Sequence, residues 1–167
     1  PHLYDELIRV PLIVNTPDIG SKISQTPVSL VDIAPTLFDL TDIPTPDKVQ
    51  GKSLLDLVDQ DEERVTISAC SGDTVSKNVS EWEYFATRTA NWKCFWRRDI
   101  DRVELYDLTK DPGELKDISH EYPDTVNYFR ELMEEHLNEA VETELTLPEV
   151  EKSENVKQRL RDLGYTE

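Results

Sequence analysis

Three strand-like runs follow one another closely between residues 84 and 108, and this pattern constrains the fold more than any other feature of the chain. The runs are Tyr84–Thr89, Trp92–Arg97 and Val103–Leu108, and their apolar and aromatic residues favour extended backbone. Only residues 90–91 and 98–102 separate them, and connections this short join antiparallel neighbours. The spacing therefore predicts an antiparallel meander with one covered face.

A long amphipathic segment follows the meander and is expected to close it. Asp124–Glu142 has the period of a helix, with several acidic residues outside its apolar stripe. The stripe consists of Val126, Phe129, Met133, Leu137 and Ala140. A second, shorter helix is predicted over Ser153–Leu163, with Gly164 as its C-cap.

The first part of the chain mixes strand and helix patterns. Leu3–Arg9 predicts one or two helical turns, and Val10–Val14 is an apolar run too short for a helix, which predicts a buried strand. Val28–Thr41 predicts a helix packed on that strand, and Leu54–Asp59 predicts a short helix. Arg64–Cys70 alternates enough to predict another strand.

These changes of period divide the chain loosely into three parts. Residues 1–62 are α/β material, residues 63–140 form the antiparallel sheet with its helix, and residues 141–167 are an acidic tail with a terminal helix. Asp111-Pro112-Gly113 lies within the second part and predicts a tight turn, because proline presets φ and glycine accepts positive φ.

The charge excludes several classes of partner. Asp and Glu number 35 against 18 Lys and Arg, a net charge of −17, so the surface repels nucleic-acid backbones and anionic lipid. No apolar run reaches the roughly 18 residues that cross a bilayer. The acid excess extends along the whole chain, which favours adaptation to high salt, as in a halophile, over an ordinary solvated surface. No targeting segment is visible, and the compartment stays open, with the cytoplasm as the default.

Residue types that carry chemistry are scattered. His2, His120 and His136 are isolated in sequence, without the spacing of a metal site. Cys70 and Cys94 form no CxxC pair; we expect buried free thiols, with a cross-strand disulfide as the alternative.

Two charged residues lie in apolar surroundings and suggest a buried pair. Arg9 stands between Ile8 and Val10, and Asp32 lies in an apolar run of the predicted helix. A buried guanidinium needs a carboxylate or several carbonyls, so we expect Arg9 and Asp32 to pair. The equally weighted alternative is that both face solvent at the ends of their elements.

Four segments together resemble the sulfatase family. Leu3–Val14 is similar to its YEExIRVPLIV segment, and Val28–Leu37 is similar to VSxVDIxPTLL. Gly51–Leu54 resembles the start of GxSLLPLL, and the segment from Arg88 to Glu114 resembles RTxxYKY…ELYDLxxDPxE. The order and spacing agree over residues 1 to about 137, which makes the joint resemblance strong.

The resemblance implies the C-terminal part of an alkaline-phosphatase-like α/β fold, in which a small antiparallel sheet with a packed helix follows a large mixed sheet. It also implies cleavage of sulfate monoesters by a formylglycine, made from Cys or Ser in a C/S-x-P-x-R motif and activated by a divalent cation, usually calcium. Neither cysteine of this chain starts such a motif. The family's metal carboxylates and sulfate-binding lysine correspond to positions before Pro1. The resemblance therefore carries over no catalytic and no metal-binding residue, and His2 is expected at most at the rim of the substrate pocket.

Three functional interpretations follow. The chain is the C-terminal fragment of a sulfatase that is inactive alone, and its partners are the N-terminal sulfatase part and, in the complete enzyme, a sulfate ester. It is alternatively a non-catalytic module that completes a split enzyme or binds another partner. The third interpretation is a fragment of a related phosphate or phosphonate esterase.

Overall fold

A four-stranded antiparallel sheet and one long helix form the best-packed part of the molecule. The structure is a computed structural model that describes residues 3–16, 20–21, 23–57, 63–71 and 81–146. The strands are β1 (Thr66–Ser71), β2 (Trp82–Arg88), β3 (Trp92–Arg97) and β4 (Arg102–Asp107), in the order β1-β2-β3-β4. The predicted meander is therefore confirmed, and Arg64–Cys70 adds the predicted fourth strand at its edge.

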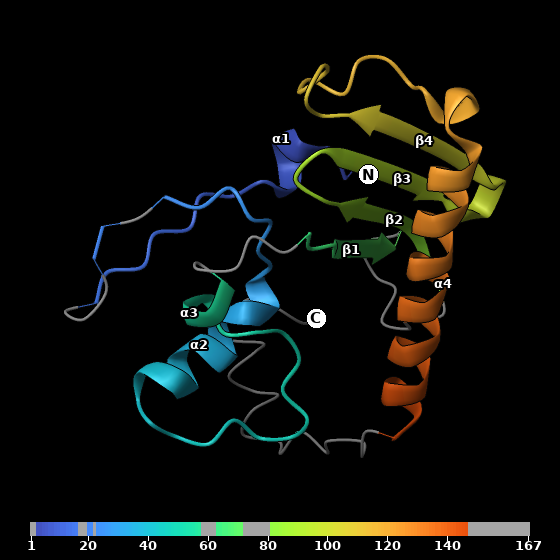
Figure 1. Cartoon of the computed structure of the whole chain (residues 1–167). Helices are drawn as coiled ribbons and strands as arrows, with labels where there is room; N and C mark the ends of the chain where they lie inside the picture. Colours follow the sequence, from blue (N-terminus) through green and yellow to red (C-terminus); the bar gives the residue numbers. More distant parts are fainter. Residues whose placement is uncertain (1–2, 17–19, 22, 58–62, 72–80, 147–167) are drawn as a thin grey trace, which may run out of the picture.

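Helix α4 (Pro123–Thr146) runs across one face of this sheet (Figure 1). Its buried residues Phe129, Met133 and Leu137 pack against Phe85 and Trp96 of the central strands. The rings of Phe85 and Trp96 are register partners with centroids 5.5 Å apart. The apolar stripe thus forms the core that its spacing predicted, and the acidic residues between stripe positions remain at the surface.

The other face of the sheet is covered by the N-terminal segment. Leu3 and the short helix α1 (Asp5–Ile8) lie against Tyr84, Ala86 and Phe95. Because successive side chains of a strand point to opposite faces, the central strands serve both clusters. The helical turns predicted over Leu3–Arg9 are confirmed, and they belong to the packing of the sheet.

Residues 10–57 contain short elements with little apolar burial. They are the 3-10 turn η1 (Leu30–Asp32), α2 (Ile33–Leu40) and α3 (Leu54–Leu57), which lie beside the sheet in Figure 1. The helix predicted at residues 28–41 is confirmed in shortened form, and the helix predicted at 54–59 is confirmed over residues 54–57, beyond which the prediction lies outside the described residues. The second helix predicted at Ser153–Leu163 lies outside the described residues.

The strand predicted at Val10–Val14 is wrong for this structure. The segment does not form a strand, and Ile13 is 89% exposed. No backbone hydrogen bond joins Leu12, Ile13 or Val14 to another described residue. A segment with strand propensity forms a strand only when a neighbouring strand hydrogen-bonds to its backbone, and none of the described residues supplies such a neighbour here. The packing of helix 28–41 on this strand is wrong for the same reason.

The turn at Asp111-Pro112-Gly113 also differs in one detail. The positive φ falls on Glu114, at 52°, and not on Gly113. The side chains of Asp111 and Glu114 explain the shift, because Asp111 accepts hydrogen bonds from two later backbone N–H groups and Glu114 is drawn inward to the sheet.

Candidate functional site

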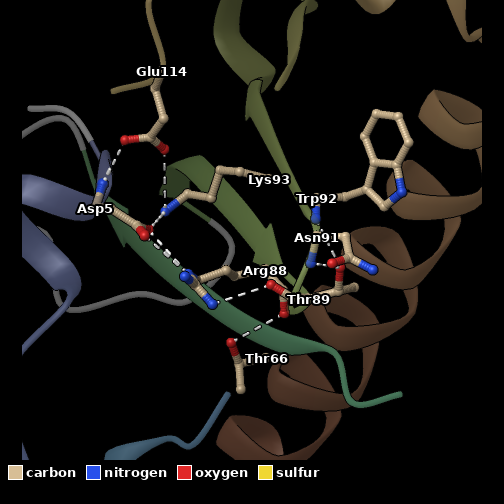
Figure 2. A network of polar contacts seen from close by, with 8 residues as sticks. All are labelled: Asp5, Thr66, Arg88, Thr89, Asn91, Trp92, Lys93 and Glu114. Atoms are coloured by element: carbon tan, nitrogen blue, oxygen red, sulfur yellow. Dashed lines mark hydrogen bonds and ion pairs between the residues drawn. The ribbon is translucent and has the colours of Figure 1, made fainter. Parts of the chain in front are cut away.

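A cluster of four charged side chains joins helix α1 to the sheet. Lys93, on β3, is fully buried, and its Nζ lies 2.9 Å from Oδ1 of Asp5 and 3.7 Å from Oε1 of Glu114 (Figure 2). Arg88, on β2, directs its Nε to both carboxylate oxygens of Asp5, at 3.0 and 3.2 Å. Asp5, Arg88, Lys93 and Glu114 are called the α1 latch below.

The sheet register explains why the latch needs an acid at its centre. Arg88 and Lys93 are register partners on neighbouring strands, so two cations lie side by side on the same face. Like charges placed opposite one another destabilise a sheet. Asp5 lies between them and neutralises this repulsion, which ties the first turn of α1 to β2 and β3.

Glu114 completes the latch from the loop after β4. Its Oε2 accepts a hydrogen bond from the backbone N–H of Asp5 at 2.8 Å, an N–H left free by the start of the helix. Its Oε1 is buried and accepts no hydrogen bond from a described residue. Burial raises the pKa of Glu114, opposed by the Asp5 N–H and by Lys93. Burial opposes the ionised form of Asp5 too, but hydrogen bonds from Lys93 and Arg88 outweigh it and lower the pKa of Asp5.

A second polar cluster lies beside the latch on the same face. Tyr4 and Tyr106 both donate their hydroxyls to Oε2 of Glu104, at 2.9 and 2.7 Å, and Arg102 lies 2.7 Å from Oε1. Burial and the neighbouring carboxylate raise the pKa of both tyrosines. The hydroxyls of both tyrosines bond to the carboxylate of Glu104, so the cluster serves as a second attachment of the N-terminal segment.

Asp32 is the centre of a third buried cluster, but its partner is Arg64 and not Arg9. Both guanidinium Nη atoms of Arg64 lie 2.7 Å from the carboxylate of Asp32, which is fully buried. Backbone N–H groups of Ser29 and Lys52 donate to the same carboxylate. Burial acts to raise the pKa of Asp32, and these hydrogen bonds outweigh it and lower the pKa. The expected pair of Arg9 and Asp32 is corrected accordingly, and Arg9 is exposed.

Gly51 lets the segment that carries Lys52 approach this cluster. It has a φ of 95°, and a Cβ at this position would lie 2.5 Å from the carbonyl oxygen of Val31. A side chain here would push the backbone away from Asp32. The Gly51-Lys52-Ser53 segment therefore has a structural role, because it brings the backbone N–H of Lys52 to the carboxylate of Asp32.

A groove of about 740 Å³ opens between α1 with the segment after it and residues 24–30. Its polar lining includes Arg9, Arg88, Thr66 and Asn91. Its apolar lining consists of Leu7, Ile8, Val10, Leu12, Pro27, Val28, Leu30 and Ala90. The groove is thus a mixed surface that begins at the latch and continues along residues 10–14.

The structure does not bring the described histidines and cysteines together into one site. His2 lies outside the described residues, while His120 is in the 3-10 turn η4 (Ser119–Glu121) before α4 and His136 is on α4. Cys70 and Cys94 are free thiols, and burial raises the pKa of Cys94 to about 12. A thiol held neutral in this way is a poor nucleophile. In the described part of the chain, no group of three or more His, Cys, Asp and Glu side chains is arranged to hold a metal ion.

The four latch residues lie within the segments that resemble the sulfatase family, but the sequence pattern did not predict that they pair. One signal pointed to Lys93: it is a charged residue between Trp92 and Cys94, at an inward position of a strand with apolar neighbours. A buried lysine requires nearby carboxylates. The sequence did not identify these carboxylates, because Asp5 lies 88 positions away from Lys93.

Comparison with known proteins assigns the chain to a family. The family model described as N-sulphoglucosamine sulphohydrolase, C-terminal, matches residues 2–143. The chain belongs to this sulfatase family. The matched range includes the sheet, nearly all of α4 and every residue of the latch, and the predicted sulfatase fold class is confirmed.

Individual sulfatases agree with this assignment. Arylsulfatase K of Gallus gallus is 31% identical over 81% of this chain, and arylsulfatase K of Homo sapiens is 32% identical over 73% of it. An arylsulfatase of Clostridium perfringens is 30% identical over 78%. The chain spans 27%, 24% and 28% of these proteins, so it covers about a quarter of the length of its relatives.

Solved sulfatase structures share the fold. A putative sulfatase from Bacteroides thetaiotaomicron superposes with a TM-score of 0.54 at 23% identity, over 70% of this chain and 26% of that one. A 2-O GAG sulfatase gives a TM-score of 0.53 at 23% identity over the same shares. At 23% sequence identity, these superpositions show a shared fold only.

Membership of the sulfatase family implies calcium and formylglycine in a complete enzyme, and the described residues of this sulfatase chain fit neither group. The two carboxylates of the latch face two cations, so they are neutralised and do not form a cage for a further cation. Neither cysteine stands in the motif that yields formylglycine. No helix in the described ranges is long and apolar enough to cross a membrane.

Proposed function

We propose that this chain is the non-catalytic C-terminal part of a sulfuric ester hydrolase and that it docks on an N-terminal part that carries formylglycine and calcium. The N-terminal part denotes the portion of a sulfatase that this chain does not span. In the assembled enzyme, the chain supplies scaffold behind a sulfate ester pocket and none of the reacting groups.

Exposed apolar side chains carry this proposal. Seventeen large hydrophobic residues are exposed in the described parts of the chain, and thirteen of them lie within residues 7–43. These are Leu7, Val10, Leu12, Ile13, Val14, Ile23, Val28, Leu30, Val31, Ile33, Leu37, Leu40 and Ile43. Exposed apolar side chains concentrated in one part of the chain in this way favour an interaction site. The sheet and α4, by contrast, form a buried core of their own.

The chemistry of the chain supports a non-catalytic role. A C/S-x-P-x-R motif is absent from its 167 residues. Among the described residues, the buried charges of the latch and of the Asp32 cluster are all paired, so they are not poised to attack a substrate or move a proton. The role that we propose for the chain is therefore structural support of a partner.

Reading the coding DNA directly upstream of Pro1 tests the proposal. We expect an open reading frame for an N-terminal part with a C/S-x-P-x-R motif, in the same gene or in a neighbouring one. A Thr or Ser nucleophile without this motif would favour a phosphate or phosphonate esterase. Unrelated coding sequence, together with no binding between the chain and any sulfatase N-terminal part of the same genome, would contradict docking.

The acid excess supports an added element of the proposal, namely adaptation to high salt. A chain with 35 acidic and 18 basic residues repels itself at low ionic strength. Counterions at molar concentration shorten the screening length to about 3 Å and relieve this repulsion. The stability of the folded chain should then depend on salt.

A further inference from the structure

Arg9 is a cation without a described partner in a strongly acidic chain. It is exposed and forms no ion pair with a described residue, whereas Arg88, which lines the same groove, is held by Asp5. Asp32, the carboxylate expected to bind Arg9, is occupied by Arg64. The guanidinium of Arg9 is therefore available to an acid from outside the described chain.

The groove has a local charge opposite to that of the whole molecule. Among the described residues, its lining contains Arg9, Arg88 and a single acid, Asp5, although acids outnumber bases about two to one in the sequence. Asp5 and Arg88 neutralise each other, which leaves the positive charge of Arg9 without a compensating acid among the described residues. An occupant of the groove is expected to carry a carboxylate at this point.

The walls of the groove favour an extended occupant. One wall continues into Leu12, Ile13 and Val14, whose backbone groups form no hydrogen bond with another described residue. The side chains of this run are exposed on both sides, and an apolar run without alternation is typical of a strand that is buried on both faces. A neighbouring strand would satisfy its backbone groups, and apolar side chains of the occupant would cover Leu7, Val10 and Leu12.

We infer that the groove receives an extended segment of the N-terminal part, with an Asp or Glu of that segment paired to Arg9. This inference rests on the proposed function and names the element of the partner that docks. The N-terminal part is the occupant of choice because the relatives extend over about four times the length of this chain. A second copy of the chain is disfavoured, because two bodies of charge −17 repel each other.

Binding of the N-terminal part, expressed as a separate polypeptide from the upstream coding sequence, tests the inference by calorimetry at two salt concentrations. Arg9→Gln should weaken binding about tenfold, a change of about 1.4 kcal/mol, and should flatten the salt dependence. Arg9→Lys keeps the charge and should remain within about threefold of the wild type. Lys48→Gln removes an exposed cation outside the groove and serves as the matched control.

The apolar wall is tested in the same experiment. Leu12→Ser should weaken binding, and Leu115→Ser, at an 88% exposed site that does not line the groove, should not. Unfolding of each variant in urea verifies that the fold is intact. We expect no change for Arg9→Gln, since Arg9 is exposed and unpartnered among the described residues.

The outcomes separate the two claims. Wild-type binding that Arg9→Gln leaves unchanged would overturn the carboxylate partner of Arg9 while the proposed function stands. Absence of wild-type binding would overturn both. Self-association of the chain alone that Arg9→Gln abolishes would assign the groove to a second copy and would also overturn the inference.

Discussion

The ammonium group of Lys93 lies 2.9 Å from the carboxylate of Asp5, a residue 88 positions earlier, and the lysine side chain is fully buried. This ion pair fixes helix α1 on the face of the sheet that α4 leaves uncovered. The N-terminal segment that leads towards the proposed partner is therefore held by the C-terminal sheet, so the chain presents its docking groove from a rigid support.

Lys93→Met tests the latch. The substitution keeps most of the side-chain length but leaves Asp5 and Glu114 buried without their shared cation. Breaking a buried pair in this way should lower the free energy of unfolding by about 3–5 kcal/mol. Lys110→Met is the matched control, because Lys110 also pairs with an aspartate but is 76% exposed. Urea unfolding measures both. Equal stability of the two variants would contradict a role for the latch.

Asp32→Asn tests the cluster at Arg64 and predicts a pH dependence. The pKa of Asp32 is lower in the folded chain than its ordinary value of 3.8. Its stabilisation is therefore complete above about pH 4 and is lost as the pH falls through the folded pKa. We expect Asp32→Asn to be about 3 kcal/mol less stable at pH 7 and to approach the wild type below pH 3.8. A difference that stays constant with pH would contradict this assignment.

Two buried threonines should respond in opposite ways to the same substitution. Oγ1 of Thr87 is buried and has no hydrogen-bond partner among the described residues, so Thr87→Val should be neutral or stabilising. Oγ1 of Thr36 donates to the carbonyl of Asp32 and accepts from the N–H of Leu54, so Thr36→Val should cost about 1–3 kcal/mol. Urea unfolding of both variants compares them. A larger loss at Thr87 would mean that its hydroxyl has a partner.

Salt should stabilise the chain if its acid excess reflects adaptation to high salt. We expect the thermal midpoint to rise by roughly 3 °C between 0.1 M and 2 M KCl, about 1 kcal/mol for a domain of this size. The combined variant Glu131→Gln, Glu135→Gln and Glu139→Gln removes three exposed charges of α4 and should reduce this rise. A midpoint that is flat across this range of salt would argue against the adaptation.

The regular elements were predictable where the sequence pattern is local. The spacing between Tyr84 and Leu108 predicted three strands, and the stripe from Val126 to Leu137 predicted the helix that covers them. In both cases the apolar residues recur at the period of the element that they form, so the pattern and the structure report the same burial.

Pairings between distant segments were not predictable in the same way. Arg9 and Asp32 satisfied the chemistry of an ion pair, but Arg64 approaches Asp32 because residues 51–54 and the segment just before β1 converge there. Val10–Val14 has the composition of a strand, yet a strand needs a partner, and none lies in the described chain. Both errors arise because the partner of a charged residue, or the neighbour of a strand, can lie anywhere in the sequence.

Sulfatase turnover tests the central claim most directly. The purified chain is assayed with an aryl sulfate and calcium, first alone and then after addition of the separately expressed N-terminal part. The account predicts no turnover by the chain alone, and turnover in the mixture that exceeds the rate of the N-terminal part by itself. Robust turnover by the chain alone, abolished by a chelator of calcium, would contradict the account.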